Sequence, residues 1–460
     1  MNRMEKDSLG EQPVPADACW GIHTQRALDN FPSTGQRVHP ALIRALALVK
    51  KACCLANLEL GYLPEEKAKA ILLACDEILA GTLADQFPLD ALQGGAGTST
   101  NMNVNEVIAN RAIEILGGAK GQYGLVDPLE DVNLHQSTND VYPTAVKIAA
   151  IMELRALCQS IASLQGAFQR KEKEFAAIPA IGRTELQEAV PLSLGAQFGA
   201  FAEAVARDRW RTFKCEERLR VVNIGGTAVG TGLGAPRRYI FLVIEKLREV
   251  TGLGLARAEN PVDQTANADA FVEVAGILSA HASTLIKIAC DLRLLNLLGE
   301  VRLPAVQVGS SIMPGKVNPV ICEYVIQCSL LCLGYVRLVE EATSRSTLQI
   351  CEFLPLVSHA LLSCLSVLRQ TDETFCRHLA QVAADPDACR RNLTGSPTLV
   401  TAFLPLIGYR RAAELLAEFA TSGRTDMAAF LAEKLGAEVV ARTLSAHNLM
   451  SLGYRDEDDA

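Results

Sequence analysis

The sequence predicts an all-α protein that is mainly helical and is built around a bundle of long helices. Aromatic residues make up only 5% of the 460 residues, while Ala and Leu are abundant, and this balance favours helix over sheet. Apolar residues recur at alternating spacings of three and four, the period of one helix face in a coiled-coil-like seam. The length exceeds one ordinary core, so we expect several domains or an unusually elongated one.

The longest of these series predicts a single helix from Phe271 to Leu295. At about 1.5 Å per residue this helix would be roughly 40 Å long. Similar series at 157–168, 321–339 and 361–379 predict further long helices, and several of them together imply a bundle. His281 occupies a position in the seam of the first series, so we interpret it as a core histidine rather than a metal ligand.

The predicted bundle is flanked by two smaller, mostly helical regions. The first part of the chain mixes short helices with turns marked by Pro and Gly, and the pattern breaks again beyond about Asp385, at Pro386 and at 395–397. We therefore predict an N-terminal domain at 1–139, a central bundle domain at 140–390 and a small C-terminal domain at 391–460.

Charge and hydropathy exclude several classes of partner. The net charge is −8, and the chain has no concentrated run of Lys and Arg, which argues against nucleic acid. No apolar run approaches the roughly 20 residues of a membrane span, and the polar start at 1–7 is unlike a signal peptide. We expect a cytoplasmic protein without a membrane partner. The acidic end at 456–459 is interpreted as a solvated tail.

Cysteine and histidine usage predicts no metal site and no cofactor. The fourteen cysteines include no C-x-x-C pair, and Cys322, Cys328 and Cys332 lie within helical apolar patterns, so we expect buried, reduced thiols. The seven histidines are scattered and lack the spacing that brings metal ligands onto one helix face. This prediction leaves room for a divalent cation as a non-catalytic activator.

The most informative segment is Gly309–Pro319, with the sequence GSSIMPGKVNP. A helical pattern follows it, and Asn318 and Pro319 are residue types that begin helices. Lys316 then lies beside a helix N-terminus, where unpaired N–H groups and the helix dipole favour a small anion. Gly309 and Gly315 would let the loop hinge as a lid over a bound substrate. On local physics alone, an ordinary helix-entry loop with a surface lysine is an equal alternative.

This loop resembles the GSSIMPxKxNP motif of the aspartase/fumarase superfamily, whose members release fumarate by eliminating an amine or water. Three further segments resemble the substrate-facing stretches of that family, in its order: Gly94–Asn105, Asn133–Thr144 and Gly182–Pro191. Within the superfamily the chain is most similar to the aspartate ammonia-lyases. The resemblance implies the fumarase/aspartase fold and a homotetramer in which each active site draws residues from three chains.

The resemblance also implies a role for each matched residue. Ser310 would be the general base that takes the Cβ proton of L-aspartate, with the resulting charge held as an aci-carboxylate. The hydroxyls that would stabilise that carboxylate are those of Thr98, Ser137, Thr138 and Ser311. The other carboxylate would be held by Lys316 and Asn318. The leaving amine would be positioned by Asn139 and Thr184. Asp140 is interpreted as structural, because it can cap the helix that contains Pro143.

One residue departs from the pattern. Fumarases and some aspartases carry histidine at the position of Glu185, and other aspartases carry glutamine. Glu185 would pair with the substrate ammonium, be held protonated, or mark a changed substrate. The alternatives are therefore a class II fumarase, a lyase for another amino-dicarboxylate, and a catalytically silent structural or binding homologue. Fumarases typically have Ser-Ser-Asn-Asp in place of Ser137–Asp140 and Thr-His in place of Thr184–Glu185, so both differences favour an ammonia-lyase.

Overall fold

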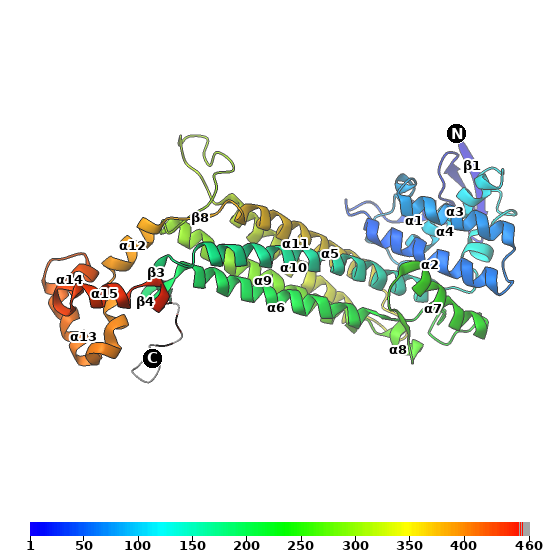
Figure 1. Ribbon diagram of the computed structural model, residues 1–460. Helices are drawn as coiled ribbons and strands as arrows, with labels where there is room; N and C mark the ends of the chain where they lie inside the picture. Colours follow the sequence, from blue (N-terminus) through cyan, green and yellow to red (C-terminus); the bar gives the residue numbers. More distant parts are fainter. Residues whose placement is uncertain (450, 452, 454–460) are drawn as a thin grey trace. The chain divides into compact units, whose positions relative to one another are not determined.

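Figure 1 shows a computed structural model of the protein, which describes residues 1–449, 451 and 453. Most of these residues are in helices, and the short strands among them form four two-stranded sheets. The predicted all-α, mainly helical fold is therefore confirmed. The acidic tail at 456–459 lies outside the described residues.

The chain divides into two compact units. Unit 1 comprises residues 1–158, 210–280 and 331–368, and unit 2 comprises 159–209, 281–330 and the chain from 369 onwards. The five longest helices contribute residues to both units, and they contain all four helices that the sequence predicts (Figure 1). These helices are α5 (Thr138–Glu174), α6 (Leu194–Leu219), α9 (Asp269–Leu297), α10 (Val320–Thr343) and α11 (Leu354–Leu379). The domain limits at 139 and 390 stay predictions.

Unit 1 also holds the N-terminal helices and two small sheets. Strands β1 and β2 form an antiparallel hairpin, β5 and β6 pair in parallel, and α2 packs against α3 and α7. The elements are β1 (Asn2–Asp7), β2 (Gly10–Pro15), α1 (Ile22–Asn30), α2 (Pro40–Glu59), α3 (Glu65–Ala80), η1 (Ala84–Gln86), α4 (Thr98–Ile115), η2 (Pro128–Val132), β5 (Val221–Val222), α7 (Arg237–Thr251), β6 (Ala256–Arg257) and α8 (Pro261–Ala266).

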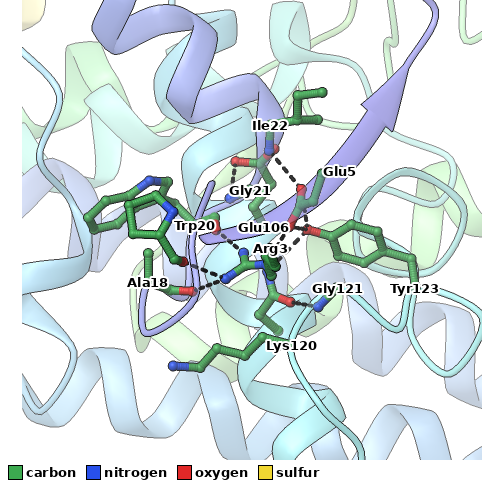
Figure 2. Close-up of polar contacts among 12 residues, drawn as sticks. Arg3, Glu5, Ala18, Trp20, Gly21, Ile22, Glu106, Lys120, Gly121 and Tyr123 are labelled. Carbon is green, nitrogen blue, oxygen red and sulfur yellow. Dashed lines mark hydrogen bonds and ion pairs between the residues drawn. The ribbon is translucent and has the colours of Figure 1, made fainter. Parts of the chain in front are cut away.

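Figure 2 shows how polar contacts close the N-terminal hairpin of unit 1. The guanidinium of Arg3 donates to the carbonyl oxygens of Ala18 and Trp20, at 2.7 and 2.5 Å, and pairs with Glu5 at 2.7 Å. The hydroxyl of Tyr123 donates to the same carboxylate at 3.0 Å. Each of these hydrogen bonds has an ionised donor or acceptor, so it is stronger than a hydrogen bond between two neutral groups.

A second carboxylate, Glu106, ties α4 to the start of α1. Its oxygens accept the backbone N–H groups of Gly21, His23 and Thr24 at 2.8 to 3.1 Å and the Thr24 hydroxyl at 2.6 Å. Burial raises the pKa of Glu106 to about 7, although these bonds oppose the shift. A Cβ on Gly21 would lie 2.6 Å from the hydroxyl oxygen of Tyr123, so only glycine fits this contact.

Unit 2 holds the C-terminal helices and two more sheets. Its core joins Ile181 of β3 to apolar residues of the last helices, among them Leu399, Phe403, Leu415 and Phe430. The elements are β3 (Pro179–Thr184), β4 (Gln187–Ser193), β7 (Val301–Arg302), β8 (Ala383–Ala384), α12 (Pro386–Gly395), η3 (Pro397–Phe403), α13 (Leu404–Thr421), α14 (Met427–Leu435), α15 (Ala437–Thr443) and α16 (Ala446–Leu449).

An ionic network in unit 2 joins four of the long helices. His281 of α9 lies between Asp208 of α6 and Asp372 of α11, at 3.3 and 3.0 Å, and Ser160 of α5 donates to Asp372 at 3.1 Å. All four side chains are buried. Burial lowers the pKa of His281, but the two aspartates outweigh it and raise the pKa to about 10. The interpretation of His281 as a core histidine is confirmed.

The expectation that the cysteines are buried holds for ten of the fourteen. All fourteen are free; Cys322 and Cys332 are buried, and Cys328 is half-buried. Helices α9 and α10 are long and apolar enough to cross a membrane by those two measures alone. A core helix of a bundle has the same length and composition, and the ionic contacts of His281 in the middle of α9 agree with a place in the bundle.

We predict that His281→Gln lowers the free energy of unfolding at pH 7 by roughly 3–5 kcal/mol, because it breaks a buried charged network. The folded-state pKa of His281 lies above its usual value, so its contribution is complete below about pH 6.5 and is lost as the pH rises through about 10. The deficit measured by chemical denaturation should therefore shrink between pH 7 and pH 9.5.

The matched control is His378→Gln. His378 is also buried in unit 2, but burial lowers its pKa to about 4, so it is neutral over this whole range. A His281→Gln deficit of the same size at both pH values would contradict the assignment of a charged His281.

Candidate active site

The first predicted substrate-facing segment, Gly94–Asn105, contains the turn before α4 and the first two turns of that helix. Gly97, with φ of +95°, precedes the helix, and a Cβ there would lie 2.4 Å from the ring of Tyr142. Glycine is therefore required for the turn that begins α4. Thr98 is the first residue of the helix; its side chain is exposed, and its hydroxyl donates to the carbonyl of Gly95 at 2.7 Å.

The second segment, Asn133–Thr144, runs into the N-terminus of α5, which begins at Thr138. The carboxylate of Asp140 is fully buried and accepts the N–H groups of Ser137, Gly225 and Thr227 at 2.9 to 3.0 Å. Burial raises the pKa of Asp140 to about 6, against the effect of those bonds. Asp140 therefore fixes the segment to the 225–227 loop, and its predicted structural role agrees with these contacts.

Neighbouring site residues in this segment are held by the same loop. The Asn139 side chain donates to the carbonyl of Ala228 at 2.7 Å, and its backbone carbonyl accepts from Asn223 at 3.0 Å. The hydroxyl oxygen of Ser137 accepts the N–H of Asn139 at 3.3 Å. The backbone of Ser137–Asn139 is thus fixed on two sides.

Asn101 brings the two helix N-termini together. Its side-chain amide donates to the hydroxyl oxygen of Thr138 at 3.2 Å and to the carbonyl oxygen of the Asn133 side chain at 3.3 Å. Thr138 thereby accepts a hydrogen bond and keeps its own O–H proton free for another acceptor. Because α4 and α5 both start here, the positive ends of two helix dipoles meet at Thr98 and Thr138.

A buried lysine supports this cluster. Lys50 of α2 is 1% exposed, and its ammonium donates to the side-chain oxygens of Asn133 and Gln136, both at 2.9 Å. Burial lowers the pKa of Lys50 to about 8, while the nearby thiol of Cys53 and the carboxylate of Asp140 act in the opposite direction. The Lys50 ammonium and the amide of Asn101, which also contacts Thr138, share the side-chain oxygen of Asn133. A positive charge this close to Thr138 favours an anionic ligand.

The third segment is the hairpin of β3 and β4 in unit 2. Thr184 pairs with Gln187, so Glu185 and Leu186 form a two-residue turn, and both have left-handed backbone with φ of +54° and +64°. Such a turn usually contains Asn or Gly, because other residues are strained there. Thr184 and Glu185 are exposed at its tip. Glu185 also lines a cavity of about 860 Å³ beside Arg183 and the end of α9.

The fourth segment is the loop before α10. The N–H of Gly309 donates to the carbonyl of Lys316 at 2.8 Å, and the Asn318 side chain donates to the carbonyl of Gly309 at 2.9 Å. A Cβ on Gly309 would lie 2.8 Å from the Lys316 carbonyl oxygen, so glycine is needed where the loop closes on itself. Helix α10 starts at Val320, two residues after Asn318, so the bond from the Asn318 side chain to Gly309 joins the two ends of the loop just before the helix.

Ser310 is held at the entrance of this loop. Its hydroxyl oxygen accepts the N–H groups of Ile312 and Met313 at 3.2 and 3.0 Å. The side chains of Ser311 and Lys316 are exposed, and no ion pair involves Lys316 in the part of the chain that the structure describes. Two N–H donors on one hydroxyl oxygen shape a turn, and they are also the donors that a negatively charged oxygen requires.

The structure groups the predicted residues into two sets. Thr98, Ser137, Thr138 and Asn139 lie together in unit 1, while Ser310, Ser311, Lys316 and Asn318 share one loop of unit 2 and Thr184 and Glu185 share a hairpin of the same unit. Sequence reasoning missed Lys50 and Asn101. Asn101 lies within a matched segment, but Lys50 gives no signal beyond a lysine within an apolar helix.

Comparisons with known proteins extend over almost the whole chain. Residues 10–334 match a family described as Lyase. An aspartate ammonia-lyase from Bacillus sp. is 42% identical over 92% of this chain and 92% of its own length. A crystal structure of a fumarate lyase:delta crystallin from Brucella melitensis bound to cobalt superposes with a TM-score of 0.93 at 44% identity, covering 98% of this chain and 99% of that one. A class II fumarase from Schistosoma mansoni gives 0.91 at 29% identity, covering 97% and 98%.

The chain belongs to the aspartase/fumarase superfamily. The matches span more than nine-tenths of this chain and of each matched chain. The four segments that resemble the family's motifs therefore lie on a shared framework rather than in isolated motif matches. Within the described residues no group of three or more His, Cys, Asp and Glu side chains could hold a metal ion.

Proposed function

We infer that this protein eliminates ammonia from L-aspartate to give fumarate, which makes it a carbon–nitrogen lyase. The observation that carries this inference is the 42% identity to an aspartate ammonia-lyase over 92% of both chains. The intact loop with Ser310, Lys316 and Asn318 supports it, because these residue types supply a base and a carboxylate clamp. The reaction is an anti-elimination and is reversible.

The hard step is the removal of a Cβ proton that is only weakly acidic. The extra electron pair must be held on the neighbouring carboxylate as an aci-carboxylate, so donors aimed at that carboxylate lower the barrier. We assign this task to Thr98, Ser137, Thr138 and Ser311. The bond from Asn101 to Thr138 supports the assignment, because it leaves the Thr138 proton free to donate. Thr98 would have to turn its hydroxyl from Gly95 to the substrate.

We assign the general base to Ser310. A serine hydroxyl is normally too weak an acid to lose its proton, so the alkoxide needs stabilisation. The N–H groups of Ile312 and Met313 already point at its oxygen, and Lys316 lies in the same loop. Lys316 and Asn318 would hold the second carboxylate, while Asn139 and Thr184 would position the amine so that it leaves anti to the proton.

A class II fumarase is the second candidate, because one superposes on the chain with a TM-score of 0.91. Its 29% identity is lower than the 42% of the aspartate ammonia-lyase. Thr138 and Glu185 both differ from the residues usual in fumarases. A carboxylate at Glu185 suits an ammonium leaving group better than a hydroxyl. A catalytically silent homologue is disfavoured by the intact base loop.

We further propose that the protein needs no catalytic metal or cofactor, acts in the cytoplasm, and works as a homotetramer with active sites shared between chains. Exposed apolar side chains on the long helices support self-association. On α10, Leu330 and Leu331 are 54% and 50% exposed, and on α6, Trp210 and Phe213 are 61% and 60% exposed. Such residues on a bundle helix favour a further helix as partner.

We predict that purified protein mixed with L-aspartate releases fumarate, detected by ultraviolet absorbance, and that L-malate gives none. Ser310→Ala should lower kcat by roughly 10²–10⁴-fold, the usual contribution of a general base. Binding of succinate, a dicarboxylate without a leaving group, should remain. Fumarate from malate alone would identify a fumarase. Full activity in the Ser310→Ala variant would show that Ser310 is not the general base.

We predict that Glu185→Gln lowers kcat/KM for L-aspartate by about 10–100-fold, since a hydrogen bond to a charged group contributes about 1.5–3 kcal/mol. Succinate has no ammonium, so its affinity should not fall. Glu438→Gln, at an exposed position of α15 outside the four segments, is the matched control and should leave aspartate kinetics unchanged. Unaltered aspartate kinetics in Glu185→Gln would show that Glu185 does not contact the substrate ammonium.

We predict a tetramer by sedimentation equilibrium. Changing Leu330 and Leu331 to Ser should weaken assembly and activity together, because the exposed apolar face of α10 would lose its partner. A wild-type monomer with full activity would refute the shared-site proposal.

A further inference from the structure

One buried ion pair of unit 2 lies at the start of two segments with assigned site residues: the tip of the β3–β4 hairpin and the Ser310 loop. Arg183 donates to Glu300 through two nitrogens, Nη1 to Oε2 at 2.9 Å and Nη2 to Oε1 at 2.7 Å. The Glu300 side chain is 1% exposed and that of Arg183 is 17% exposed. Asn392 of α12 adds a third donor to Oε1 at 2.9 Å. A bidentate pair with a further donor fixes both side chains in one geometry.

Arg183 lies directly before the tip of the hairpin. Thr184 and Glu185 follow it in the chain, and a register shift between Ile181 and Arg183 marks a bulge in β3. A Cβ on Gly182 would lie 2.8 Å from the carbonyl oxygen of Val190, so the bulge depends on glycine. Bulges change the direction of the next side chain, and this one directs Arg183 onto Glu300.

Glu300 lies at the base of the Ser310 loop. It follows α9, and the next residues, Val301 and Arg302, form β7, after which the chain enters the loop. Its carbonyl accepts the N–H of Asp385 at 2.9 Å, and β7 pairs with β8. Both the backbone and the side chain of Glu300 are therefore fixed, while Ser311–Val317 are exposed.

Thr184, Glu185 and the Ser310 loop have few other supports. The hairpin tip is exposed and strained, and the loop is closed mainly by its own bonds through Gly309 and Asn318. The Arg183–Glu300 pair joins the strand that leads to the hairpin tip to the part of the chain that leads into the Ser310 loop, where the N–H of Leu303 also donates to the side chain of Asn296 at 3.1 Å. Buried ion pairs seldom add net stability over apolar packing, so its geometry is the more informative property.

We propose that Arg183 and Glu300 are positioning residues for the elimination reaction. Their ion pair sets the place of the Thr184–Glu185 tip and of the base of the Ser310 loop together, so a change at either residue displaces both segments. This proposal rests on the proposed function. It requires no contact of Arg183 or Glu300 with substrate, and it applies whether the two segments serve the same active site or two different ones.

The test is a double-mutant cycle with Arg183→Gln, Glu300→Gln and the double variant. Each single variant should lose about 10–100-fold in kcat with a smaller change in KM, because a displacement of about 1 Å has that effect on a reacting geometry. The kcat of the double variant should be no lower than that of the less active single variant, since both substitutions remove the same contact. Arg183→Lys, which keeps the charge but not the bidentate bond, should recover part of the activity.

Arg302→Gln is the matched control. Arg302 pairs with Asp385 beside the same two short strands, but its side chain is 71% exposed and none of its described bonds reaches the hairpin. Its kinetics should equal those of the wild type. If the Glu300 variant does not fold, Asn392→Ala keeps the ion pair and removes the third donor to Glu300 together with a 3.3 Å bond to the Leu298 carbonyl; it should lower kcat by about 3–10-fold with circular dichroism unchanged.

Three results would overturn the proposal. Variants with a lower melting temperature but wild-type kcat would show a purely stabilising pair. Multiplying losses in the double variant would show that the residues act independently, and a loss confined to the KM of Arg183 variants would show direct substrate binding. Wild-type protein is assayed first with L-aspartate and L-malate. Failure with aspartate rejects the proposed function, while the cycle can still be measured with whichever substrate reacts.

Discussion

The register of the long helices is the constraint on which this molecule depends. His281, Asp208, Asp372 and Ser160 fix four of these helices against one another inside unit 2, and none can slide without breaking a buried charged contact. One residue of slip along a helix is about 1.5 Å. Such a network has a desolvation cost, and an apolar layer would be as stable, so what it adds is a single arrangement of the helices.

Register matters because three of the four site segments adjoin the end of a long helix. α5 begins at Thr138, and α6 begins just after the hairpin that carries Glu185. α9 ends before Glu300, and α10 begins at Val320, after the Ser310 loop. A rigid helix transmits its position to its first and last residues, whereas a free loop does not. Reactive groups held by helix ends can therefore meet the tolerance of about 1 Å that catalysis requires.

The electrostatics of the site differ from those of the whole chain. The protein carries a net charge of −8, yet the segments assigned to a dianionic substrate gather positive potential from several small sources. These are the N-termini of α4 and α5, the ammonium of Lys50 and that of Lys316. Glu185 is the one carboxylate among the residues assigned to substrate, and the proposed ligand carries an ammonium that such a carboxylate would recognise.

The sequence was sufficient for the long helices and for the segments that carry the site, and insufficient for what holds those segments. Seam spacing predicts α9 because 29 residues keep one apolar face. It does not predict the pair of Arg183 and Glu300, which lie 117 residues apart. Nor does it distinguish Lys50 from an ordinary surface lysine, since the partners of its ammonium belong to a loop 83 to 86 residues away. Local rules such as capping and periodicity describe neighbours in the chain, whereas these supports depend on folding that brings distant residues together.

Ser310 shows how the two kinds of information combine. A hydroxyl oxygen that accepts two N–H groups is a common turn feature, and in most loops it has no chemical consequence. In this loop the same donors lie beside Lys316 and precede a helix, so a charge on the Ser310 oxygen would be met by donors already in place. Pre-existing donors need no reorganisation when charge develops, which is the condition under which they lower a barrier most. The proposed role of Ser310 as general base therefore depends on its surroundings, which include the two fixed ends of the loop, at Glu300 and at the start of α10.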